Sequence, residues 1–135
     1  MLAASTYPQD YIDDCRAAVA AQLETYDTLA ATADEGALAA FAPRFFAHMT
    51  LALDAYFMHR QRGKEGKDGN AMNEVRLLCA AIMEHGAVLQ ADKQIKLKPE
   101  TSVLGLAAGD VIVLDRDGFG RLADAYFDAI AAAFT

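Results

Sequence analysis

Near the start of the chain, apolar residues recur at steps of three and four positions, the spacing of one face of an α-helix. This first apolar stripe consists of Ile12, Cys15, Val19, Leu23, Tyr26 and Ala30. Thr6 and Gln9 precede it at the spacing of a capping box, in which two side chains bond free backbone groups of the first helical turn. The pattern predicts a long helix that follows Thr6 and ends near Thr32.

Two further stripes predict two further helices. The second stripe contains Phe45, Met49, Leu53, Tyr56 and Phe57, and the third contains Ala71, Val75, Leu78, Cys79 and Ile82. Pro43 suits the first turn of the second helix, which should end near Arg60 and follow a separate short helical turn at residues 37–41. Asn70 is a favourable cap for the third helix, and residues 85–86 (His-Gly) mark its end.

Beyond Leu89 the periodicity changes. Residues 94–98 alternate polar and apolar side chains, and residues 111–114 (Val-Ile-Val-Leu) are mostly β-branched, so both segments are predicted to be short strands that pair with each other. Asp115 or Asp117 is expected to cap a last helix with its apolar face formed by Phe119, Leu122, Tyr126, Ile130 and Phe134.

These patterns predict a single domain over residues 1–135. Its fold class is α+β but mainly α, with a three- to four-helix bundle and a small two-stranded β element before the last helix. The β element forms a hairpin-like insert at about residues 94–114. An isolated strand pair of this size is marginally stable, so it should pack on a helix or on a second subunit.

Composition and charge narrow the classes of partner. The chain has 135 residues, 54% of them hydrophobic, and a formal net charge of −7, which suits one folded domain and disfavours a nucleic-acid partner. The charge is uneven, since residues 59–98 carry a balance of +3 and the remainder carries −10. This polarity leaves room for a local anion site, or for pairing between oppositely charged ends of two subunits. We therefore expect a homo-oligomer, and a homodimer in particular.

No apolar run approaches 18 residues, and the first eight residues lack the features of a signal peptide. Neither a membrane partner nor a secreted location is therefore expected, and the predicted location is the cytoplasm. Cys15 and Cys79 both lie on predicted apolar helix faces, where they resemble small core residues in a reducing compartment. A disulfide between them stays open at this point.

The loop from Gln61 to Asn70 is the one long stretch without an apolar residue, and it lies just before a predicted helix. A helix N-terminus carries free N–H groups and partial positive charge, and glycines allow close backbone approach to a ligand. Arg62, Lys64, Lys67 and Asn70 are therefore candidate ligands for a small anion such as phosphate or a carboxylate. The alternative is a solvated helix connector, which is the commoner use of such loops.

A second candidate site lies between the second and third predicted helices. Folded as an ideal antiparallel hairpin, they would bring His48 level with His85 and His59 level with Glu74. Such a groove would suit general acid–base chemistry in a small hydrolase-like enzyme. The alternative is two ordinary pairs at the boundary of the core. Metal-ligand, nucleophile and dinucleotide motifs are all missing from the sequence, so we expect no metal and no cofactor.

Four sequence stretches resemble a small bacterial protein family of actinobacterial type. They are His59-Arg60, Gly66-Lys67-Asp68-Gly69-Asn70, Asn73-Glu74-Val75-Arg76-Leu77-Leu78-Cys79 and Ile95-Lys96-Leu97-Lys98-Pro99-Glu100. That family has no assigned function, so the resemblance implies a bacterial cytoplasmic protein and transfers no site. The sequence favours a non-enzymatic binding or interaction protein that uses the loop at residues 61–70, with the hydrolase-like enzyme as the alternative.

Overall fold

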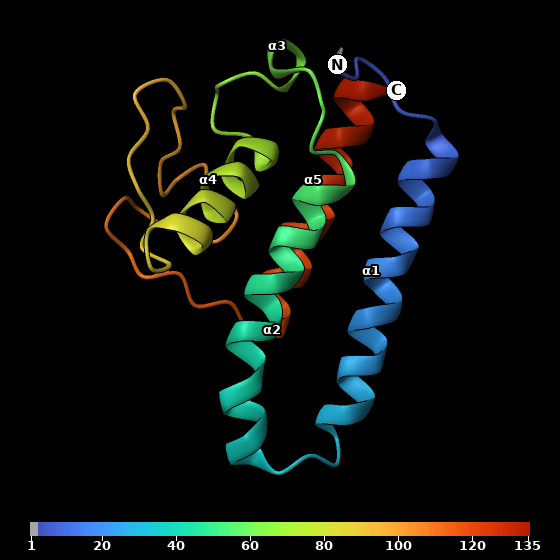
Figure 1. Ribbon diagram of the computed structural model, residues 1–135, viewed down its shortest axis with the longest axis vertical. Coiled ribbons are helices and arrows are strands. Elements are labelled where there is room, and N and C mark those ends of the chain that lie inside the picture. The colour runs from blue at the N-terminus through green and yellow to red at the C-terminus, as the bar shows by residue number, and fades with distance from the viewer. Residues whose placement is uncertain (1–2) are drawn as a thin grey trace.

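A computed structural model describes residues 3–135 as a bundle of helices (Figure 1). The helices are α1 (Gln9–Ala30), α2 (Glu35–Tyr56), α3 (Arg62–Glu65), α4 (Ala71–Glu84) and α5 (Arg116–Phe134). The long helices α1, α2 and α5 lie side by side, and the shorter α4 packs against α2 and α5. A long connector without regular secondary structure joins α4 to α5 on the flank of the bundle away from α1.

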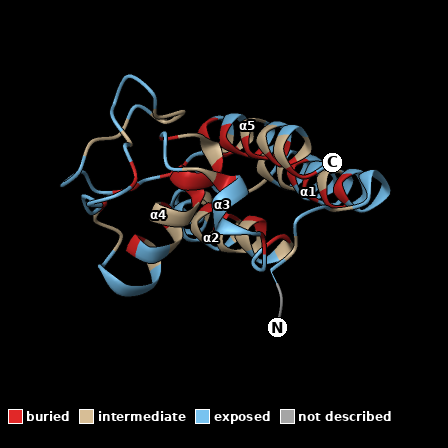
Figure 2. Cartoon of the chain, turned by 90° about the horizontal axis from the view of Figure 1, so that it is seen from above, coloured by how far each residue is buried: buried red, intermediate tan, exposed pale blue. Residues whose placement is uncertain are grey.

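Helix α5 is the centre of the core. It contacts all four other helices, and every residue of its predicted apolar stripe is buried, which confirms that prediction. Helix α1 contributes Ile12, Cys15, Val19 and Leu23 from its own predicted stripe. Figure 2 shows buried residues gathered where the helices meet, while much of the connector and the outer turns of α1 are exposed.

The structure confirms two predicted helix caps and corrects two predicted helix starts. The Asn70 side chain accepts a hydrogen bond from the Asn73 N–H at the start of α4, and Asp115 accepts one from the Gly118 N–H at the start of α5. Helix α1 begins at Gln9 directly after Pro8, whose fixed backbone angle suits a helix start, so Thr6 is not its cap.

The second helix is longer at its start than the sequence suggested. Helix α2 runs unbroken from Glu35 and includes Pro43 in its interior, where a separate turn followed by a new helix was expected. The Asp34 side chain accepts a hydrogen bond from the Ala37 N–H, so the helix is capped more than two turns before Pro43. It also ends at Tyr56 instead of Arg60.

The predicted two-stranded β element is wrong. The described chain, residues 3–135, contains no strand, and its β pairing is limited to isolated bridges of Ala4 with Arg60 and Val88 with Val111. Residues 94–98 do not pair with residues 111–114, because their N–H groups bond to acceptors elsewhere. Ile95 donates to the Asp92 carboxylate, and Lys96 donates to the Lys67 carbonyl. Residues 94–114 are therefore part of an irregular connector.

Candidate functional site

The loop at residues 61–70 surrounds a buried ion cluster. Glu65 is completely buried, and its carboxylate accepts hydrogen bonds from Arg60 (2.8 Å), Asn73 (2.9 Å) and Arg76 (2.6 and 3.0 Å). Burial by itself raises the pKa of Glu65, but the hydrogen bond from Arg76 and the charge of Arg60 outweigh it, so the pKa lies below its ordinary value. The cluster joins α3 to α4 and fixes the path of the loop.

Two of the four predicted anion ligands are already engaged with the protein itself. Lys64 donates to the Ser5 carbonyl and lies 5.5 Å from the centre of the Phe134 ring. Asn70 caps α4 through its oxygen and donates from its amide to the Glu65 carbonyl at 2.7 Å. Arg62 and Lys67 are exposed. The loop therefore presents two of its predicted ligands to solvent and uses the other two for folding.

The structure does not join the predicted histidine and glutamate groups into one constellation. Helix α2 ends before His59, so the ideal hairpin register does not apply. His48, His59 and His85 are exposed, and among residues 3–135 no hydrogen bond or ion pair links any of them to Glu74. The nearest acidic partner of His85 is its neighbour Glu84, at 4.0 Å.

Glu74 has a different role, and no pattern in the sequence signals it. Its buried carboxylate accepts hydrogen bonds from the Ser102 hydroxyl at 2.7 Å, the Val103 N–H at 2.7 Å and the Leu104 N–H at 3.3 Å. These three donors lie in the connector, about thirty residues away in sequence. Glu74 thereby fastens the connector to α4.

The described residues offer little evidence for a metal site or for a reactive thiol. Within residues 3–135 no group of three or more His, Cys, Asp or Glu side chains is placed to hold a metal ion. Cys15 and Cys79 are free thiols. Burial raises the pKa of Cys15, and it raises the pKa of Cys79 to about 12, so both are protonated at neutral pH and poorly nucleophilic.

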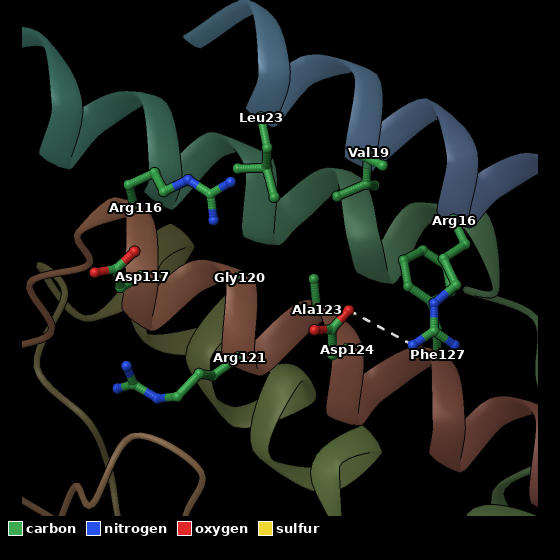
Figure 3. A pocket seen from close by; sticks show the side chains of 11 residues that line it. Arg16, Val19, Leu23, Arg116, Asp117, Gly120, Arg121, Ala123, Asp124 and Phe127 are labelled. Carbon is green, nitrogen blue, oxygen red and sulfur yellow. Dashed lines mark ion pairs between the residues drawn. The ribbon is translucent and has the colours of Figure 1, made fainter. Parts of the chain in front are cut away.

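A groove of about 580 Å³ lies between α1 and α5. Its apolar lining includes Val19, Leu23, Ala123 and Phe127, and its charged residues include Arg16, Arg116 and Arg121 (Figure 3). This volume is typical of ligand-binding sites. Whether the groove is a candidate ligand site depends on whether its charged side chains are already paired within the protein.

Most of those charges are paired within the protein. Arg116 donates from two nitrogens to both carboxylate oxygens of Asp27, each at 3.0 Å. Arg16 pairs with Asp128 at 2.9 Å and with Asp124 at 3.5 Å. Figure 3 shows Arg121 extending from α5 in a different direction from Arg116, so the two guanidinium groups do not converge on one point. These ion pairs therefore hold α1 and α5 together, and the groove has few charged groups left to bind a ligand.

The outer face of α2 is the unusual surface of this protein. Helix α2 is the one described helix long and apolar enough to cross a membrane, by length and composition alone, yet only 17% of its most apolar 18-residue window is buried. Its buried residues Phe46, Thr50 and Leu53 share one side. An ordinary surface helix places charged residues on the opposite side. Over its whole length α2 has only four acidic or basic side chains, at residues 35, 44, 48 and 54.

The opposite side of α2 forms a regular seam. At 100° per residue, the positions that lie away from the core are Ala37, Phe41, Arg44, His48, Leu51 and Ala55, with Met58 just beyond the helix end. They follow one another at steps of four and three, which is the heptad spacing of helices that pair along their length. Leu51 is half-buried and the other six are exposed. We call these seven residues the α2 seam.

An apolar hollow lies at each end of the α2 seam. The first has a volume of about 470 Å³ and is lined by Ala37, Ala40, Phe41, Arg44, Phe45 and His48. The second has a volume of about 560 Å³ and is lined by Ala4, Tyr7, Pro8, Tyr11, Ala55, Tyr56, Met58 and His59. His48 and His59, predicted as catalytic candidates, therefore line two separate apolar hollows.

Comparison of the chain with models of protein families, with curated proteins and with solved structures finds no match. The resemblance to a bacterial family of actinobacterial type stays a prediction.

Proposed function

We propose that this protein is a non-enzymatic interaction protein that works as a homodimer, with the α2 seams of two copies packed against each other. The observation that carries the proposal is the mismatch between the apolar composition of α2 and its low burial. Exposed apolar surface of this extent along a helix is costly in water and is removed when a partner covers it.

The geometry of the seam favours a second copy as that partner. Helices pair lengthwise when apolar positions alternate at steps of three and four, because side chains of one helix then fit between those of the other. The same seam on two copies is complementary to itself under a twofold axis, which is the commonest symmetry of soluble dimers. The small residues Ala37 and Ala55 permit close approach of the two backbones.

Charge favours an antiparallel arrangement. Asp34 and Glu35 lie at the start of α2, while Arg62 and Lys64 follow its end. An antiparallel pair places the acidic start of each helix beside the basic end of the other, whereas a parallel pair places like charges together. The uneven distribution of charge along the sequence would thus stabilise an antiparallel interface.

The hollows indicate the register. A pairing centred between Met49 and Thr50 places Phe41 of one copy opposite Met58 of the other, over the apolar hollow at the end of α2. The same register brings the acidic start of α2 in one copy toward the residues that follow the end of α2 in the other, where Arg62 is exposed. It also separates Arg44 from His48 of the second copy, which avoids a repulsive contact when the histidine is protonated.

A membrane is a poorer partner for the same surface. Arg44 and His48 lie in the middle of the α2 seam, and a charged guanidinium is costly to place within a bilayer. The other side of α2 is occupied by the core through Phe46 and Leu53, so the helix cannot leave the bundle without exposing that core. In a cytoplasmic homodimer, one side of α2 packs on the core and the other side packs on the second copy.

The test is sedimentation equilibrium of the purified protein over a wide concentration range. We expect a reversible dimer, with Phe41→Asp and Leu51→Glu shifting it to monomer. Ala18→Glu, on the exposed side of α1, is the matched control and should leave the dimer intact. Circular dichroism confirms that each variant is folded.

A charge exchange tests the orientation. Glu35→Arg alone and Arg62→Glu alone should each weaken the dimer, and the double variant should recover part of the loss. A wild-type protein that stays monomeric at every concentration overturns the proposal. Binding of the monomer to phosphatidylcholine vesicles, lost in Phe41→Asp, would overturn it in favour of a membrane surface.

A further inference from the structure

The segment at residues 111–114 was predicted to be a strand, and it keeps the side-chain alternation of one. Ile112 and Leu114 are 8% and 3% exposed, whereas Val111 and Val113 are 63% and 72% exposed. One side of the segment is paired through the isolated antiparallel bridge of Val88 with Val111. The alternation that suggested a strand is therefore real, although only one bridge forms.

The backbone of the segment has a used side and an unused side. The Ile112 N–H donates to the Ala87 carbonyl at 2.7 Å, and the Leu89 N–H donates to the Asp110 carbonyl at 2.9 Å. Alternate residues of an extended chain direct their N–H and C=O groups to opposite sides. Those of Val111 and Val113 are directed away from residues 87–89, and they have no hydrogen-bond partner anywhere in residues 3–135.

An extended segment with free donors and acceptors on one side is a template for an added strand. Proteins normally protect such an edge with lysine, proline or a covering loop. Here the two side chains at the edge are exposed valines, which add apolar contacts to the free backbone groups. We propose that Val111–Leu114 binds an extended peptide segment of another protein by strand addition.

Charge indicates what kind of peptide fits. Three carboxylates, those of Asp110, Asp115 and Asp117, flank the segment. Among the cations near them, Arg116 is bonded to Asp27, and Arg121 lies one helical turn beyond Asp117, so the carboxylates remain in excess. A partner strand with β-branched residues between basic ends therefore complements the edge. A second copy of this segment does not, because antiparallel self-pairing of Val111 with Val113 would place Asp110 of one copy opposite Leu114 of the other, next to its Asp115.

This surface is separate from the α2 seam. It lies in the connector before α5, and none of its residues lines either hollow of the seam. The inference therefore does not depend on the proposed dimer.

The test uses NMR titration of the full-length protein with the peptide Lys-Val-Thr-Val-Thr-Val-Lys. We expect the amide signals of Val111 and Val113 to shift and their hydrogen exchange to slow. The same peptide with glutamate at both ends should bind at least about tenfold more weakly, because like charges then meet at both flanks. A peptide with N-methyl groups on the edge that faces the protein should not bind.

A pair of variants separates backbone pairing from side-chain contact. Val113→Pro removes one N–H donor, while Val113→Ala retains it and only shortens an exposed side chain. Strand addition predicts that Val113→Pro weakens binding about fivefold to tenfold more than Val113→Ala does. Equal losses in both variants, or peptide shifts confined to other parts of the protein, would overturn the inference.

Discussion

Arg60 and Glu65 form an ion pair in which neither side chain is exposed to solvent at all. The Nε of Arg60 lies 2.8 Å from Oε1 of Glu65, and a second guanidinium nitrogen of Arg60 lies 2.8 Å from the Asp54 carboxylate. Arg76 also binds the Glu65 carboxylate, at 2.6 Å. Every buried side-chain nitrogen and oxygen in residues 3–135 has a hydrogen-bond partner, so the cluster is fully satisfied.

Replacing one member of this cluster should destabilise the fold strongly. In Glu65→Gln, the shape is retained but Arg60 is left buried with less compensating charge, and loss of a buried partner costs about 3–5 kcal/mol. Urea unfolding monitored by circular dichroism measures the change. Gln61→Ala, an exposed position just before the same short helix, is the control and should change the free energy of unfolding by less than about 0.5 kcal/mol. Similar stability in the two variants would contradict this account.

The same pair predicts the direction of acid sensitivity. The pKa of Glu65 in the folded protein is lowered from its ordinary value of about 4.3, because the bonds and charges from Arg76 and Arg60 exceed the opposing effect of burial. Its contribution to stability is therefore fully present above the ordinary pKa and is lost as the pH falls through the folded pKa. Urea unfolding at a series of pH values should show this loss in wild type, with a shallower acid slope in Glu65→Gln.

Glu74 should control the order of the connector more than that of the bundle. In Glu74→Ala, the Ser102 hydroxyl and the Val103 and Leu104 N–H groups lose their shared acceptor. We expect faster amide hydrogen exchange at residues 102–104 by about tenfold or more, with smaller changes in α1. Native-state exchange followed by mass spectrometry measures this difference. Uniformly faster exchange throughout the chain would indicate global destabilisation and contradict a local role.

Two glycines of the loop should respond differently to the same substitution. Gly69 has a φ of 87°, and a Cβ placed there would lie 2.5 Å from the Lys96 carbonyl oxygen. Gly69→Ala should therefore lower the free energy of unfolding by about 1–3 kcal/mol. Gly63 has no neighbouring atom within 4 Å of such a Cβ, so Gly63→Ala is the matched control. Thermal unfolding compares the two, and equal melting temperatures would show that the loop adapts to the methyl group.

The helix at residues 35–56 shows one limit of prediction from sequence. Pro43 was assigned to a helix start because it lacks an N–H and suits the first turn. The Asp34 cap and the packing of Phe46, Thr50 and Leu53 instead hold one continuous helix around it. Local preference was overridden by burial, which depends on residues far away in the chain.

The carboxylates of Glu65 and Glu74 show a second limit. Glu65 lies in the loop predicted to be an anion site or a solvated connector, and Glu74 was assigned to a groove with histidines. Each is instead buried among donors that the fold brings together, Glu65 with Arg60 and Arg76, and Glu74 with residues 102–104. A charged side chain is buried only where tertiary contacts supply its partners, so no local pattern reveals such a site.

What the sequence by itself determined is the set of helical faces and two of the caps. The stripes at Ile12–Leu23 and Phe119–Phe134 and the caps Asn70 and Asp115 depend on contacts within a few residues, so period and residue type suffice to locate them. Only the tertiary structure decided that residues 111–114 have one edge without a strand partner and that the apolar seam of α2 faces away from the core. Both depend on which segments meet in space, because a side chain or a backbone edge is exposed only when no other part of the chain covers it.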